Sequence, residues 1–370
     1  MPERVSYPSV IALLGRRDQP TDGVEDYCRW LGRALEHHGC ALDLVRVSWD
    51  QTGWHAALGA LEASAVSWRG QWVLVQYTAL GWSRRGFPLR FLQVLRTLRR
   101  MGARSVIVFH DAQPYGGFRW IDRIRRACQI WVMRRAYHWS DRTVLTVPLE
   151  RAAWLPSRPV KAAFVPVGAN LLPPPMGDGY GASTRACKTV AVYGVTGGSA
   201  ALSEVRDISH AVKRAKSQLG EIRLVVFGRG SSEAETPLLR ELEGSGVEVS
   251  VLGLLSPEEV AHELALADAL LFVRGGVSSR RGSALAGLAC ELPVVGYRSE
   301  ETGFPVTEGG VVFVALRDRE ALGEALTQVL ANDDWRRQLR QRSRIAQEQY
   351  LSWEAISRSF LQLLNQGAAQ

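Results

Sequence analysis

The amino-acid sequence predicts an α/β protein built from two Rossmann-like domains in succession. Three observations lead to this prediction. The chain has 370 residues, which exceeds the usual size of a single compact core. Short β-branched runs alternate with longer amphipathic runs, which is the pattern of βαβ units and of a parallel sheet. A segment rich in proline and glycine interrupts this pattern near the middle of the chain.

The first βαβ series occupies residues 1–170, which we expect to form the N-terminal domain. Its predicted strands are 10–14, 42–47, 72–77, 105–109, 143–147 and 163–167. Its predicted helices are 24–38, 89–101 and 120–139. Each strand is an apolar run followed by a polar or glycine-containing turn, as is typical of buried parallel strands.

The second series follows a linker that we place at residues 171–186, where three prolines precede three spaced glycines. The predicted strands of this C-terminal domain, residues 187–348, are 189–194, 222–228, 247–251, 269–273, 293–296 and 310–314. Residues 349–370 are predicted to form a last helix. The two halves are not obvious sequence repeats of each other.

The composition fits an ordinary globular protein with enough apolar material for two cores, because 46% of the residues are hydrophobic and 22% are charged. No uncharged apolar run reaches the length of a membrane-spanning helix. Residues 1–4 are followed by a stretch typical of a strand, which does not resemble the apolar core of a signal peptide. We therefore expect a cytoplasmic protein, or one peripheral to the inner face of a membrane. The five cysteines are widely spaced and form no CxxC pair, so we expect reduced thiols and no protein-held metal.

Positive charge is concentrated between Arg84 and Arg142, where fourteen arginines accompany only Asp111, Asp122 and Asp141. Tryptophan and phenylalanine are interleaved with these arginines. The pattern fits contact with an anionic membrane surface or a phosphorylated acceptor. Solvated helix faces with buried tryptophans fit it equally well. No recognised nucleic-acid-binding module accompanies the charge, so we expect no nucleic-acid partner.

Ligands bind at the carboxyl ends of strands in open parallel sheets, so the residues that follow each strand are the candidate site. In the first half, a polar loop ends at Asp22 and Gly23 directly before a helix, where backbone amides could meet an anion. An ordinary loop with Asp22 as the N-cap is the plainer interpretation. His110 and Asp111 follow another strand, where an imidazole beside a carboxylate could orient a sugar hydroxyl or donate to phosphate.

In the second half, glycine-rich turns follow the first two predicted strands, and Arg229 is the only cation in either turn. The strongest pattern begins at Arg274, after the fourth strand, and leads into a helix with small residues. Two arginines and a helix N-terminus converge there, which is a set of fixed donors suited to a diphosphate. The candidate phosphate-binding residues of this loop are Ser278, Ser279, Arg280, Arg281, Gly282 and Ser283.

Five segments, taken in order, resemble family-four (group 1) glycosyltransferases. They are residues 22–27, 165–170, 266–269, 284–295 and 352–354. The resemblance spans nearly the whole chain and implies the bacterial-type GT-B fold, in which two Rossmann-like domains face each other across a cleft. It also implies a last helix that crosses back to the first domain. Gly23 matches a position that approaches the donor phosphate, and His110 one near the transferred sugar.

The sequence departs from the resembled family at two positions. The family usually carries two glutamates around the diphosphate-binding helix, and Ser278 and Ala286 occupy those positions here. The chain therefore resembles a divergent branch in which the phosphate contacts have moved onto the loop that holds Arg280 and Arg281.

We interpret the chain as a glycosyltransferase that transfers a sugar from a nucleotide diphosphate sugar to a saccharide or lipid-linked acceptor in polysaccharide or glycoconjugate synthesis. The resemblance implies retention at the anomeric carbon, no metal and no other cofactor. Two alternatives stay open. The lost glutamates fit a catalytically inactive nucleotide-binding or scaffold protein. Two Rossmann-like halves also occur in dinucleotide oxidoreductases, although no in-frame G-x-G-x-x-G follows a predicted strand.

Overall fold

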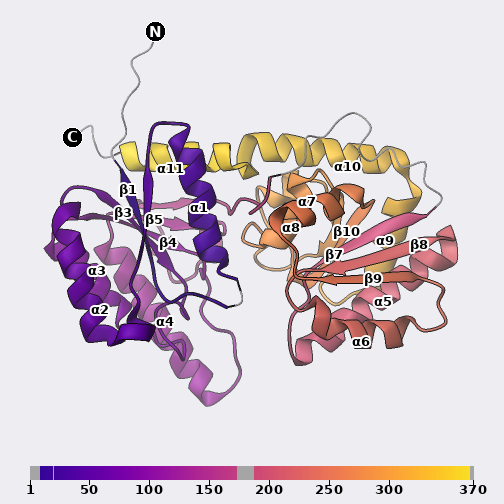
Figure 1. The fold of residues 1–370 in the computed structure, drawn as a ribbon, viewed down its shortest axis with the longest axis horizontal. Coiled ribbons are helices and arrows are strands. Elements are labelled where there is room, and N and C mark those ends of the chain that lie inside the picture. Colours follow the sequence, from indigo (N-terminus) through magenta and orange to yellow (C-terminus); the bar gives the residue numbers. More distant parts are fainter. Residues whose placement is uncertain (1–8, 20, 173–186, 367–370) are drawn as a thin grey trace, which may run out of the picture. The chain divides into compact units, whose positions relative to one another are not determined.

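The computed structural model describes residues 9–19, 21–172 and 187–366 and divides into two compact units (Figure 1). The first unit is Met1–Pro166 together with Trp353–Gln370, and the second is Val167–Ser352. Residues 167–170, which the sequence analysis placed in the first domain, lie in the second unit, as do residues 349–352. Most of the predicted linker, residues 173–186, lies outside the described residues.

The first unit contains a sheet of six strands, in which every neighbouring pair is parallel. The strands are β1 (Val10–Leu14), β2 (Leu42–Arg46), β3 (Trp72–Tyr77), β4 (Arg104–Phe109), β5 (Arg142–Leu145) and β6 (Ala162–Phe164). Their spatial order is β2-β1-β3-β4-β5-β6. The chain moves from β1 to β2 on one side and returns to β3 on the other, so the strand order reverses between β1 and β3.

Helices cover both faces of this sheet (Figure 1). They are α1 (Gly23–Glu36), α2 (Trp49–Ala65), α3 (Phe91–Arg100), α4 (Trp120–Trp139) and α11 (Trp353–Asn365), with short 3-10 turns at Val66–Trp68 and Leu149–Arg151. Ile11 and Leu13 of β1 join one core with apolar residues of α2, α3 and α4. Because side chains alternate along a strand, Val10 and Ala12 face the opposite side, which α1 and α11 cover.

Helix α2 was absent from the sequence analysis, which placed no element between residues 47 and 72. Its apolar residues repeat weakly, and only four of its seventeen residues are buried: Trp49, Ala57, Leu61 and Ala65. Gly53 also has a positive φ of 79°, which interrupts the helix near its start. A helix that buries so little of its surface leaves only a faint periodic signal.

The second unit contains a second sheet of six strands that are also all parallel. The strands are β7 (Lys188–Tyr193), β8 (Ile222–Phe227), β9 (Glu248–Gly253), β10 (Ala269–Gly276), β11 (Val294–Tyr297) and β12 (Val311–Val314). Their order is β12-β11-β10-β7-β8-β9, so this sheet reverses between β7 and β10. The predicted α/β architecture with two parallel sheets is confirmed.

Helices again cover both faces of the sheet in the second unit (Figure 1). They are α5 (Ser199–Leu219), α6 (Ser231–Leu242), α7 (Pro257–Leu266), α8 (Gly282–Ala289), α9 (Arg319–Ala331) and α10 (Asp333–Ala346), with short turns at Val306–Glu308 and Gln347–Leu351. One apolar core joins the sheet to α5, α6 and α9, and a second core joins its other face to α7 and α8. Both faces of the sheet are therefore covered, and only its edges and strand ends remain open to solvent or a ligand.

The last helix, α11, packs against α1 in the first unit. The Trp353 ring stacks on the Trp30 ring at 6.5 Å between centroids and meets the Tyr27 ring edge-on at 5.3 Å. The Oε1 atom of Glu354 lies 3.0 Å from Nε2 of His38. Ile356 and Phe360 are fully buried. The C-terminal helix is therefore part of the core of the first unit.

We expect Phe360→Ala to lower the free energy of unfolding of the first unit by about 3–5 kcal/mol, because it empties a site that no water reaches. Calorimetric unfolding of the full chain measures this loss. Gln362→Ala, at an exposed position of the same helix, is the matched control and should leave the transition almost unchanged. Equal unfolding of the two variants would show that α11 contributes little to the core.

Candidate functional site

In the second unit, the strand order reverses between β7 and β10, and the residues at the carboxyl ends of these two strands touch. Gly194 follows β7 with a positive φ of 84°. A Cβ built on Gly194 would lie 2.8 Å from Nη1 of Arg274 in β10. Glycine is therefore required for Arg274 to lie across the end of β7. The reversal places a cation where open parallel sheets bind their ligands.

Arg274 and Arg281 are the cations least satisfied by their surroundings in this region. The Nε atom of each is buried and has no hydrogen-bond partner among the described residues. Burial lowers the pKa of Arg281, and the charge of Arg280 lowers it further. Glu301 opposes this shift, and Arg274 and Glu204 have smaller effects of opposite sign. A guanidinium stays protonated in proteins. The reversal of strand order between β7 and β10 therefore holds partly buried positive charge that an anion could neutralise.

Arg280 is in a different state from its neighbour Arg281. Its Nε and Nη2 atoms donate to the two carboxylate oxygens of Glu301, each at 2.8 Å. The pair is bidentate and half-buried, which fixes the Arg280 side chain. The sequence analysis assigned both arginines to phosphate. In the structure, Nε and Nη2 of Arg280 are already engaged by Glu301, whereas the buried Nε of Arg281 has no hydrogen-bond partner among the described residues.

Ser278 and Ser279 are enclosed by protein, with only 0% and 1% of their surfaces exposed. The Ser278 hydroxyl is buried without a hydrogen-bond partner among the described residues. The Ser279 carbonyl accepts a hydrogen bond from the Val167 amide at 2.9 Å. Both residues therefore shape the loop from inside, where the sequence analysis had expected side chains that contact phosphate directly.

Gly282 and Ser283 form the first turn of α8 and lie closer to solvent, with Gly282 exposed and Ser283 half-buried. No side chain caps this helix, so its first amides are oriented toward an approaching anion. Arg229 is exposed in the turn after β8. The Arg229 carbonyl accepts a hydrogen bond from Val195 at 2.9 Å, which holds that turn against the one after β7.

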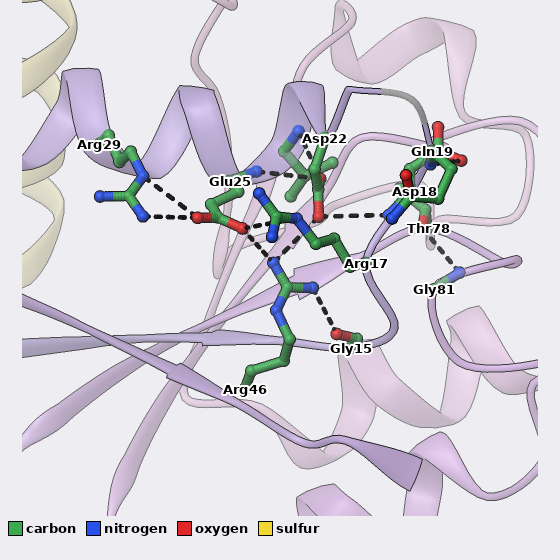
Figure 2. A network of polar contacts seen from close by, with 11 residues as sticks. Gly15, Arg17, Asp18, Gln19, Asp22, Glu25, Arg29, Arg46, Thr78 and Gly81 are labelled. Carbon is green, nitrogen blue, oxygen red and sulfur yellow. Dashed lines mark hydrogen bonds and ion pairs between the residues drawn. The ribbon is translucent and has the colours of Figure 1, made fainter. Parts of the chain in front are cut away.

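In the first unit, the loops after β1 and β3 pack directly on each other at the corresponding reversal. The Arg16 amide donates to the Gly81 carbonyl at 2.8 Å. A Cβ on Gly15 would lie only 2.3 Å from the same Gly81 oxygen. Gly15 and Gly81 lie close together in Figure 2. Only glycine at position 15 permits this close contact.

An ion-pair network fixes the start of α1 next to these loops (Figure 2). Asp22 caps the helix, because its Oδ1 accepts from the amides of Val24 and Glu25, both at 3.1 Å. Arg46 donates to Asp22 at 3.0 Å, to Glu25 at 2.7 Å and to the Gly15 carbonyl at 2.7 Å. The helix amides that the sequence analysis offered to an anion are therefore partly occupied by Asp22.

Gly23 is exposed at the first position of α1, and a Cβ added there would meet no atom within 4 Å. Its φ lies outside the range that favours glycine. Nothing inside the described residues therefore requires a glycine at this position. A group that approaches from outside the first unit would give such a requirement, as the family resemblance implies for a donor phosphate.

His110 follows β4, and its partner is Gln76 of the neighbouring strand β3. The two side chains lie 2.8 Å apart between Nε2 of His110 and Oε1 of Gln76. The Gln76 amide nitrogen donates to the Leu74 carbonyl, so its oxygen faces the imidazole. Nε2 therefore carries the proton, and Nδ1 of the neutral ring can accept a hydrogen bond. The Tyr27 ring packs edge-on against the imidazole at 4.8 Å between centroids.

Burial lowers the pKa of His110 to about 4, against a smaller opposing effect of Asp22. The imidazole is therefore neutral near pH 7. Asp111, which the sequence analysis paired with His110, instead accepts from the Ala79 amide at 2.9 Å. Asp111 also lines a cavity of about 370 Å³ at the carboxyl ends of β3 and β4, whose wall includes Leu80, Arg85 and Tyr115.

The sequence analysis gave no role to four residues at the strand ends of the two units: Gln76, Arg46, Glu301 and Arg274. Gln76 left a signal in the sequence, because it is a polar residue inside the apolar run of β3. Arg46 is likewise a charged residue at a strand end. The ion pair of Glu301 with Arg280 joins residues 21 positions apart, and no local pattern marks it.

Comparison with known proteins shows which type of domain the second unit carries and which fold the chain has. Residues 192–332 match the family model described as "Glycosyl transferases group 1", so the second unit carries a domain of this type. No curated protein sequence matches the chain.

Several solved structures have the same fold along the whole chain. Sucrose-phosphate synthase from Thermosynechococcus elongatus superposes with a TM-score of 0.70 at 19% identity, covering 98% of this chain and 100% of that one. HepE from Anabaena, in complex with UDP and glucose, superposes with a TM-score of 0.67 at 12% identity. The match covers 97% of this chain and 100% of HepE. A glycosyltransferase from Rickettsia africae superposes with a TM-score of 0.69 at 10% identity. The match covers 98% of this chain and 99% of that one. The predicted GT-B fold is thereby confirmed.

The depressed pKa of His110 predicts a pH dependence of stability. The unfolded chain takes up the imidazole proton near pH 6.5, whereas the folded chain does so only near pH 4. The contribution of His110 is therefore fully present above pH 6.5 and is lost as the pH falls from 6.5 toward 4. We expect a loss on the order of 1–3 kcal/mol relative to His110→Gln over this window, measured by denaturant unfolding. A His110 imidazole that titrates near 6.5 by NMR would contradict the burial described here.

Proposed function

We propose that the chain is a glycosyltransferase whose second unit binds a nucleotide diphosphate sugar at the carboxyl ends of β7 and β10. The observation that carries this proposal is the pair of half-buried arginines Arg274 and Arg281, whose buried Nε atoms have no hydrogen-bond partner among the described residues. It lies in the segment that matches the group 1 glycosyltransferase model. A diphosphate supplies several charged oxygens, and guanidinium groups hold such oxygens with fixed geometry.

In the proposed reaction, the bond between the anomeric carbon and the diphosphate breaks while an acceptor hydroxyl forms the new glycosidic bond, and the hydroxyl proton passes to the leaving diphosphate. Negative charge develops on the leaving diphosphate. Arg281, Arg274 and the first amides of α8 stabilise that charge, and they are already oriented before the reaction begins. Arg280 acts as a positioning residue, because its pair with Glu301 fixes the loop that presents Arg281. The guanidinium groups supply the counter-charge to the diphosphate, so we propose that transfer requires no divalent metal.

The proposed site has no carboxylate at the two positions where the resembled family carries glutamates. Ser278 is fully buried and Ala286 is buried in α8. Other groups must therefore bind the hydroxyls of the ribose and of the transferred sugar. Retention at the anomeric carbon is part of this proposal and rests on the family resemblance.

The first unit is the proposed acceptor side. Its cavity near Asp111 combines apolar, cationic and acidic walls, as small-molecule sites commonly do. A saccharide or lipid-linked saccharide is the proposed acceptor. With a pKa of about 4, His110 is a weak base, so we assign it a hydrogen bond from a sugar hydroxyl to Nδ1. HepE, a structural neighbour, was solved with UDP and glucose, which fits ligands of this class.

A catalytically inactive nucleotide-binding protein is the second candidate, because both glutamate positions lack a carboxylate. Donor hydrolysis separates the two functions. An active enzyme should slowly hydrolyse the sugar nucleotide and release nucleoside diphosphate even without acceptor. The inactive protein should bind the sugar nucleotide without hydrolysing it.

We expect Arg281→Ala to weaken nucleoside diphosphate binding by about 10- to 100-fold, because it removes a charged group whose buried Nε has no hydrogen-bond partner among the described residues. A thermal-shift screen with nucleoside diphosphates and sugar nucleotides identifies the ligand, and calorimetric titration gives the dissociation constants. Arg337→Ala is the matched control, since that exposed arginine pairs only within α10. Binding that is equally strong in both variants would exclude Arg281 from the donor site.

We expect Gly23→Ala to reduce the turnover number at least tenfold while leaving the unfolding temperature unchanged or slightly raised. The added methyl group has free space inside the first unit and favours the helix, so only an approaching donor would meet it. Gly59→Ala is the control, because Gly59 also lies in a helix with nothing within 4 Å of an added Cβ. If both variants turn over like the unaltered protein, Gly23 does not lie at the donor.

A further inference from the structure

Helix α4 exposes a row of large apolar side chains to solvent. Trp120, Ile124 and Trp131 are 72%, 50% and 49% exposed. With Ala127, which is also exposed, they are spaced four, three and four residues apart and lie along one side of the helix. The core of the first unit is packed by other residues of α4, such as Val132 and Met133. The helix therefore has a second apolar face that the unit does not cover.

The apolar surface continues beyond α4 into the neighbouring loops. Phe118, two residues before the helix, is fully exposed, and Tyr115 is half exposed. Leu89 lines a crevice together with Trp131, between α3 and α4. We call the set of Phe118, Trp120, Ile124, Trp131 and Leu89 the α4 patch. Single exposed apolar residues are common on protein surfaces, but a continuous group of this kind indicates a contact surface.

Arginines flank the α4 patch, and the three carboxylates of residues 84–142 have partners within the first unit. Four exposed arginines lie on the same helix: Arg123, Arg126, Arg134 and Arg135. The only acidic residue of α4 is Asp122, which is buried and paired with Arg125 at 2.6 Å. The other two carboxylates between Arg84 and Arg142 also have internal partners, since Asp111 accepts from Ala79 and Asp141 accepts from Ser105 at 2.7 Å. The surface around the patch is therefore positively charged.

We propose that the α4 patch docks onto the surface of a lipid bilayer that contains anionic lipids. Tryptophan and phenylalanine side chains insert at the level of the headgroups, while arginine stems lie along the apolar layer and keep their charges at the phosphates. Each basic residue near an anionic membrane adds to the electrostatic attraction between the protein and the bilayer. No helix in the described ranges is long and apolar enough to cross a membrane, so the contact lies along the surface. This inference goes beyond the proposed glycosyl transfer and does not depend on it.

Vesicle sedimentation of the full chain tests the proposal. We expect binding to vesicles of phosphatidylcholine mixed with phosphatidylglycerol, weak binding to phosphatidylcholine alone, and a loss of binding at high salt. Trp120→Ser with Trp131→Ser should weaken binding at least tenfold, and so should Arg123→Gln with Arg126→Gln. The matched controls are Leu239→Ser, whose side chain is 50% exposed in the second unit, and Arg337→Gln in α10. Both controls should bind as the unaltered chain does.

Two readouts separate the bilayer from other anionic partners. Brominated lipids should quench the tryptophan fluorescence, and Trp120→Phe with Trp131→Phe should remove most of that quenching. Thermal unfolding of each variant shows that the fold is kept, as expected for exposed positions. Equal binding to both vesicle types, absence of binding at low salt, or binding without quenching would each overturn the proposal. So would a DNA oligonucleotide that binds as tightly as the anionic vesicles and is equally weakened by the tryptophan substitutions.

Discussion

Parallel strand pairing is the constraint on which both candidate sites depend, because it brings the carboxyl ends of all strands in a sheet to one edge. At each reversal of strand order, the first strand of the unit ends in a glycine whose Cβ would collide with its neighbour. Gly15 leaves room for the Gly81 carbonyl, and Gly194 leaves room for Arg274. Close packing at these two points joins loops that are distant in the sequence and places polar groups at the strand ends.

The two edges then differ in how their charges are balanced. In the first unit, Arg46 is satisfied by Asp22, Glu25 and a backbone carbonyl, so the start of α1 is a closed network. In the second unit, the Nε atoms of Arg281 and Arg274 are buried and find no acceptor among the described residues. Desolvating a charge without a partner costs free energy, and a protein retains such a group where a ligand supplies the partner. This difference favours the second unit as the place where an anionic donor binds.

Helix α4 shows that the basic and aromatic composition of residues 84–142 has two separate structural roles. Phe91 is buried, and Trp139 is half-buried beneath Arg96 and Arg135. These aromatic residues belong to the packing of the first unit. Trp120 and Trp131, by contrast, stand exposed on one side of the helix. The packed residues fit the second interpretation of the composition, and the exposed residues are the part of the segment on which the proposed contact with a partner rests.

The sequence by itself determined the two parallel sheets and the strand ends at which the candidate site residues lie, because buried strands and their turns leave recognisable local patterns. The predicted strands agree with the observed ones to within a few residues, and α2 was missed because it buries little apolar surface. Only the tertiary structure decided which neighbouring residues have unused hydrogen-bonding capacity. Arg280 and Arg281 look alike in the sequence, but Glu301 satisfies Arg280 alone. His110 is likewise paired with Gln76, although Asp111 is its neighbour in the chain. Such pairings depend on contacts between distant segments, and local sequence patterns do not encode them.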